Sequence, residues 1–158
     1  MDWGHLFVVS SAATLFIPTV VSAWTQPFPI TIIMFLASLC STGYHYYYQK
    51  KFSDLDVTWA SITTLSTLVM LVLLSLQFGI RSKRVTVPFF LMMMAIFIFV
   101  TKASLSDNPT DQESNNRYDL WHGIWHILTS LSALFILNHK INYKYILHPM
   151  VELYRQFF

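Results

Sequence analysis

The sequence predicts an all-helical membrane protein, a single bundle of about five transmembrane helices formed by residues 1–158. Only 11% of the residues are charged and 54% are hydrophobic, whereas soluble domains carry about 25% charged residues. The aromatic content of 16% suits a chain that meets two lipid–water interfaces. This composition argues against a soluble enzyme, a disordered chain and a nucleic-acid-binding protein. The single cysteine, Cys40, excludes an internal disulfide and any multi-cysteine metal site.

Five segments are apolar enough to cross a bilayer, for which about 20 residues are needed. They are residues 5–24, 29–48, 57–78, 87–102 and 119–137. Met1 and Asp2 lack the positive charge of a signal peptide, so we expect the first segment to be retained. Pro18 predicts a kink within it. The second segment ends in an aromatic run, Tyr44–Tyr48, which is typical of an interface.

Polar stretches separate these segments. Residues 49–56 are expected to form one loop, and residues 103–118 the longest loop. The fourth segment is short, and Lys102 at its end can extend its amine to the interface. The basic tail, residues 138–158, could lie flat on the membrane surface.

Positive charge predicts the orientation of the bundle. Arg81, Lys83 and Arg84 place the loop between the third and fourth segments in the cytoplasm, and the basic C-terminus lies there too. The N-terminus and the acidic loop after the fourth segment then face outward. The predicted topology places Lys50 and Lys51 on the outer side, which the positive-charge rule does not favour.

Titratable groups within membrane segments are costly and by default indicate function. In this chain they gather at the outer ends of three segments. They are Ser41 and His45 in the second, Asp54 and Asp56 before the third, and His122 and His126 in the fifth. The predicted topology, drawn from charge alone, places all of them at one membrane depth. Each pair spaced four residues apart shares a helix face.

Three imidazoles from two helices suit Zn²⁺, which in catalytic sites takes three protein ligands and a water. We therefore predict that His45, His122 and His126 bind Zn²⁺ near the extracytoplasmic side. Zinc can lower the pKa of its water to about 7. Asp56 could position or deprotonate that water, and Ser41 could assist it or the oxyanion that forms at a carbonyl.

The remaining histidines and aromatic residues have simpler interpretations. His5, His139 and His148 are expected to be ordinary hydrogen-bonded interface residues. Trp121 and Trp125 are expected to be interface anchors rather than cofactor contacts.

The motifs resemble those of the CREST superfamily of integral membrane proteins, which includes alkaline ceramidases, adiponectin and progestin receptors, the phospholipase that trims GPI-anchored proteins, and myomaker. The family pattern is Ser-x3-His in the second helix, an Asp near the third, and His-x3-His in the last. Ser41–His45 and His122–His126 match the two histidine motifs. Residues 16–21, Phe-Ile-Pro-Thr-Val-Val, resemble the first-helix motif of the GPI-phospholipase and myomaker branch.

Two features depart from that family. Its members typically have seven helices, and five are expected here. Asp56 follows His45 by eleven residues, a spacing similar to that of alkaline ceramidases. In the GPI-phospholipase branch the Asp lies deeper in the third helix, at a position that corresponds to about Ser61 in this chain.

The resemblance and the motif together imply a zinc-dependent membrane hydrolase that acts on a lipid amide or ester. Membrane lipids would be its substrate or ligand. The alternative is a non-enzymatic, myomaker-like membrane-remodelling or fusion protein with structural zinc. A haem-binding bundle is a third reading and ranks below both, because His122 and His126 share one helix.

Overall fold

The computed structural model describes residues 3–47, 50–103, 112–143 and 155, and all regular structure in these ranges is helical. The elements are α1 (Trp3–Ala13), α2 (Phe16–Thr25), α3 (Phe28–Tyr47), α4 (Lys50–Phe78), α5 (Lys83–Ile98), a π-helical turn η1 (Phe99–Ala103) and α6 (Gln112–Leu137). Five stretches are long and apolar enough to span a membrane: Trp3–Thr25, Phe28–Tyr47, Leu55–Phe78, Lys83–Thr101 and Asp119–Leu137. The predicted all-helical class is confirmed, as is the number of helices long and apolar enough to cross a membrane among the described residues.

The first span is broken between α1 and α2, at Thr14 and Leu15. Pro18 has no N–H to donate to the carbonyl of Thr14, four residues earlier. The Ile17 N–H donates to that carbonyl instead, at 3.0 Å. The chain therefore bends one turn before Pro18, as the sequence predicts.

Three helices begin four or more residues earlier than predicted. Because α4 starts at Lys50 and α6 at Gln112, the expected loops at 49–56 and 103–118 are largely helical where they are described. The fourth span starts at Lys83 rather than 87, because the Ser82 hydroxyl accepts a hydrogen bond from the Arg84 N–H and caps α5. Hydropathy marks where a helix leaves the bilayer, and a polar helix can continue beyond that point.

Most of the predicted interfacial tail, residues 144–154 and 156–158, lies outside the described residues. The described part, 138–143, packs against the end of the bundle.

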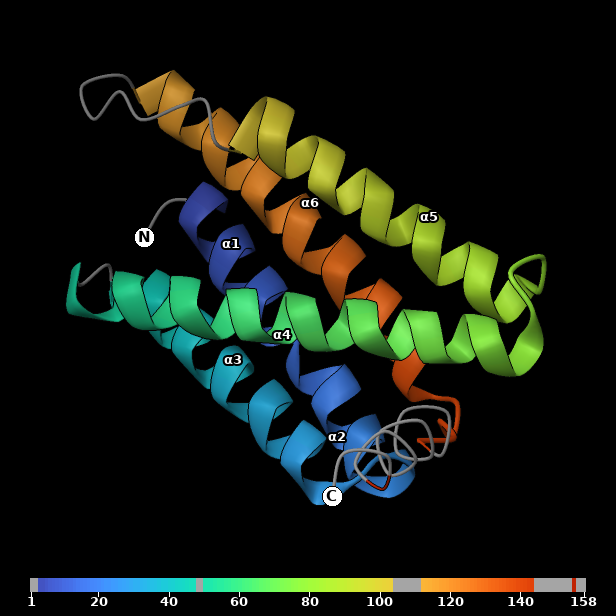
Figure 1. Ribbon diagram of the computed structural model, residues 1–158. Helices are drawn as coiled ribbons and strands as arrows, with labels where there is room; N and C mark the ends of the chain where they lie inside the picture. Colours follow the sequence, from blue (N-terminus) through green and yellow to red (C-terminus); the bar gives the residue numbers. More distant parts are fainter. Residues whose placement is uncertain (1–2, 48–49, 104–111, 144–154, 156–158) are drawn as a thin grey trace.

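α6 lies at the centre of the bundle, packed against α1, α2 and α5, while α3 packs against α1, α2 and α4 (Figure 1). α4 and α5 meet at a turn in which Gly79 adopts a left-handed φ of 82°, a conformation that glycine tolerates. From that turn the two helices diverge (Figure 1). The buried apolar cluster lies near the turn and includes Met34, Leu74 and Ile136.

Small hydroxyl side chains fill the interior between the first span, α3 and α6. Thr14 Oγ1 and Ser130 Oγ lie 2.8 Å apart, and Thr19 Oγ1 and Ser38 Oγ lie 3.0 Å apart. Small polar residues let transmembrane helices approach closely and form hydrogen bonds across the interface. These pairs therefore fix the first span against α6 and α3.

Gln26 closes the end of the bundle where α6 stops. Its Nε2 donates to the carbonyls of Leu137 (3.0 Å) and His139 (2.7 Å), and its Oε1 accepts from the Tyr143 hydroxyl (2.8 Å). The last carbonyls of a helix have no partner within the helix, so this side chain supplies one. Burial raises the pKa of Tyr143, which keeps its hydroxyl a donor.

Replacing Gln26 with Leu should lower the free energy of unfolding by about 1–3 kcal/mol, since the His139 carbonyl and the Tyr143 hydroxyl lose their partner, while the Leu137 carbonyl keeps the Thr25 hydroxyl. The matched control is Gln77→Leu, because Gln77 also makes two bonds to the segment after α6, both in exposed surroundings. We expect it to cost less than about 1 kcal/mol. Detergent-micelle unfolding curves measure both, and equal losses would contradict the assignment of Gln26 as the principal contact.

Candidate metal centre

One face of α3 is buried and polar. Ser38, Ser41 and His45 recur at intervals of three and four residues, which places them on one side of a helix. All three are buried, and the His45 side chain is only 2% exposed. This face is turned toward the first span and α6 rather than toward lipid.

α6 presents a matching face. Asp119, His122, His126 and Ser130 follow the same spacing and are all buried. His122 and His126 are 6% and 2% exposed. The predicted four-residue histidine pair therefore points into the bundle.

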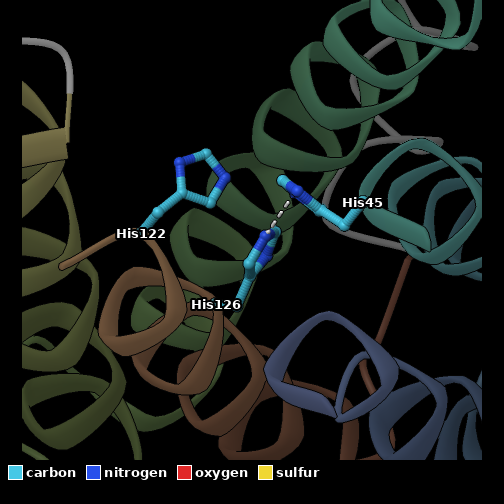
Figure 2. A group of neighbouring side chains, drawn as sticks. All are labelled: His45, His122 and His126. Atoms are coloured by element: carbon cyan, nitrogen blue, oxygen red, sulfur yellow. Dashed lines mark hydrogen bonds between the residues drawn. The ribbon is translucent and has the colours of Figure 1, made fainter. Parts of the chain in front are cut away.

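The three histidines meet between α3 and α6 (Figure 2). His45 Nε2 and His126 Nε2 lie 3.1 Å apart, and the ring centroids of the three residues are 4.8–5.0 Å from one another. One ring nitrogen from each residue lies within 4.8 Å of the other two. His45, His122 and His126 are thus close enough to bind a metal ion.

Ser41 lies one helical turn before His45 on α3, and Asp56 lies near Ser41 on the neighbouring helix α4. The Ser41 side chain is 4% exposed, and its hydroxyl has no hydrogen-bond partner of normal geometry among the described residues. The half-buried Asp56 carboxyl of α4 faces that hydroxyl. The alternative position, Ser61, is exposed and donates to the Val57 carbonyl. The side chain of Asp54 lies outside the described residues.

Aromatic rings cover the α5 side of the cluster. The Trp125 ring centroid is 5.2 Å from that of His122 and 4.8 Å from that of His126. Phe99, in the π-helical turn, packs on Trp125 at 5.0 Å. The Trp125 ring thus packs on two of the histidines, a contact that the sequence did not predict.

Gly123 lets α1 approach the same turn of α6. A Cβ atom there would lie 2.4 Å from Phe7 Cε1 and 3.1 Å from Ser11 Oγ. Sequence reasoning did not single out this residue. A glycine inside a helix, between two candidate ligands, was the available signal for close packing.

Two further titratable residues lie in this half of the bundle. Asp119, 6% exposed, is one helical turn before His122, and an acid inside an apolar span was the signal that could have found it. His5 of α1 lies close enough to His45 for their charges to interact, although the sequence analysis predicted an ordinary interface residue.

The fold and the cluster define the class of this molecule as a helical bundle consistent with an integral membrane protein, with three buried histidines able to hold a metal ion. Comparison of the chain with protein-family models, curated proteins and solved structures finds no match in any of the three.

Proposed function

We propose that this protein is a zinc-dependent membrane hydrolase acting on a lipid amide or ester bond. The observation that carries the proposal is the convergence of His45, His122 and His126 at a buried point, one helical turn from Ser41, whose hydroxyl Asp56 faces. The resemblance of these motifs to the CREST superfamily supports the same reading. The charge pattern favours an extracytoplasmic position for the site.

The donor set fits zinc. Two nitrogens bound to one tetrahedral zinc at 2.0–2.1 Å lie about 3.3–3.4 Å apart, close to the 3.1 Å between His45 and His126. The widest separations, up to 4.8 Å, show that the His122 ring would have to turn inward to complete the set. The short distance between His45 and His126 also leaves no room for a porphyrin between them, which argues against haem.

The chain's own residues would divide the reaction between them. Bound zinc would supply a Lewis acid and an acidified water. Asp56 would orient that water and take its proton as general base. The Ser41 hydroxyl would donate to the oxygen on which negative charge develops at the lipid carbonyl. Trp125 and Phe99 would keep bulk water away from the histidines.

Asp56→Asn tests the catalytic role. Removal of a general base typically lowers turnover by about 10²–10⁴-fold, so we expect at least a hundredfold loss with zinc content unchanged. An untargeted lipid comparison of cells expressing wild type and variant identifies the substrate, and purified protein then gives the rate.

The control for Asp56→Asn is Ser61→Ala, on the same helix but exposed. It should leave both turnover and zinc content unchanged. Full turnover by Asp56→Asn would remove the assignment of Asp56.

A structural zinc in a membrane-remodelling or fusion protein is the second candidate. The burial of all three histidines, none more than 6% exposed, favours it, because catalytic zinc needs an open coordination position. Under this reading the protein binds zinc, but Asp56→Asn changes no lipid product.

A further inference from the structure

We propose that the end of the bundle opposite the histidines binds the head groups of anionic phospholipids in the surrounding bilayer. Exposed cations from two separate segments lie at this end. Arg81, Lys83 and Arg84 come from the α4–α5 turn and the start of α5, and Lys140 follows α6. Gln77 of α4 joins the two segments by donating to the Lys140 carbonyl at 3.4 Å. Figure 1 shows this turn and the end of α6 far from the start of α4.

Packing against Phe78 orders one of the cationic groups, the Arg84 guanidinium. The Arg84 guanidinium lies 4.5 Å from the centre of the Phe78 ring, and the His139 ring lies 5.9 Å from the same ring. Partial burial, together with the nearby charge of Arg84, lowers the pKa of His139, which agrees with a positive potential at this end. A binding group that is already ordered loses less conformational entropy when a ligand arrives.

No described acid neutralises these cations. The acidic side chains that the structure describes, Asp56 and Asp119, both lie in the half of the bundle that holds the histidines. Juxtamembrane Lys and Arg residues attract anionic lipids, each contributing measurably to binding. An anionic phospholipid, whose head group has a phosphate and no positive charge, therefore complements the charge of this end.

Apolar side chains at the same end favour a bilayer lipid over a soluble phosphate. Trp24, Phe28 and Ile80 are 87%, 74% and 75% exposed. Trp24 and Phe28 flank Gln26, whose side chain bonds the segment that leads to Lys140. A lipid can place its phosphate against the cations and its acyl chains along these side chains, which free phosphate cannot do.

The test is a titration of the full-length protein in detergent micelles with phosphatidylglycerol or phosphatidylcholine, followed by native mass spectrometry. Wild type should bind phosphatidylglycerol about a hundredfold more tightly than phosphatidylcholine. The triple variant Arg81→Gln, Lys83→Gln, Lys140→Gln should bind phosphatidylglycerol about a hundredfold more weakly than wild type, because each cation that is removed weakens binding about fivefold. Its affinity for phosphatidylcholine should not change.

The Arg81→Lys variant conserves the charge and should keep the preference for phosphatidylglycerol. If the triple variant does not fold, the single variant Lys83→Gln, at an exposed position, should bind phosphatidylglycerol about fivefold more weakly than wild type. Equal affinity of wild type for the two lipids, or an undiminished preference in the triple variant, would overturn the proposal. Displacement by glycerol phosphate at the concentration at which the lipid binds would assign the cations to a soluble phosphate and would overturn it as well.

Discussion

Changing His126 to Ala should abolish metal binding, with wild type carrying about one zinc per chain and the variant almost none. The His126 side chain is only 2% exposed, and its Nε2 lies 3.1 Å from that of His45, close to the spacing of two nitrogens on one zinc. Changes to residues that only support a ligand already weaken metal affinity by about 10–100-fold. Loss of the ligand itself should exceed that range.

Stability provides a second measurement of the same change. A metal that binds only the folded chain stabilises it by about 2.7 kcal/mol at a hundred times its dissociation constant. A membrane-permeant chelator should therefore lower the melting temperature of wild type and leave that of the His126→Ala variant unchanged.

The matched control is His139→Ala, a histidine beside Phe78 at the other end of the bundle, which should retain full zinc content. Wild-type protein that holds no transition metal after growth and purification with zinc would rule out the centre. A His126→Ala variant with undiminished zinc would rule out the ligand assignment.

Gly123→Ala should destabilise the protein by about 1–3 kcal/mol, the usual cost of overpacking. In an ordinary helix this change would be favourable by about 1 kcal/mol. Here the added methyl would lie 2.4 Å from the Phe7 ring, so Phe7 must turn away or α1 must move from α6. We also expect weaker zinc binding, because Gly123 lies between His122 and His126. Unfolding curves and zinc titrations measure the two effects.

Gly43→Ala is the matched control, because Gly43 is also helical and lies two residues before His45. No atom that would contact its added Cβ lies within 4 Å, so stability should stay the same or rise by about 0.5–1 kcal/mol. Adding Phe7→Ala to Gly123→Ala should recover part of the loss. If both glycine variants shifted stability equally, the close approach of α1 would not explain the effect.

Much of the fold could be predicted because the bilayer imposes a length and a hydropathy on each span. The predicted end of the last segment, residue 137, is confirmed, because α6 ends at Leu137. The break in the first span could be predicted because proline removes one defined hydrogen bond. The true starts of α4 and α6 could not, because residues such as Lys50 and Gln112 are compatible with both a loop and a helix in water.

The histidine cluster could be predicted because two four-residue spacings each fix a helix face and charge fixes their common depth. The residues around it could not. Trp125 suits an interface as well as a buried contact, and only the path of η1 brings Phe99 onto it. Gln77 holds the segment of Lys140 at the end of the bundle where Arg84 lies, and no motif in the sequence marks Gln77.

The length of α4 has a consequence for the membranes that suit this chain. The stretch of α4 without a charged residue, 57–78, has 22 residues against 18 in the corresponding stretch of α6, 120–137, or about 33 Å against about 27 Å at 1.5 Å per residue. A hydrocarbon layer about 30 Å thick matches the shorter stretch, and the longer one fits only by tilting or by locally thickening the layer. Such hydrophobic mismatch is relieved when a helix tilts, so α4 should tilt more in a thin bilayer than in a thick one.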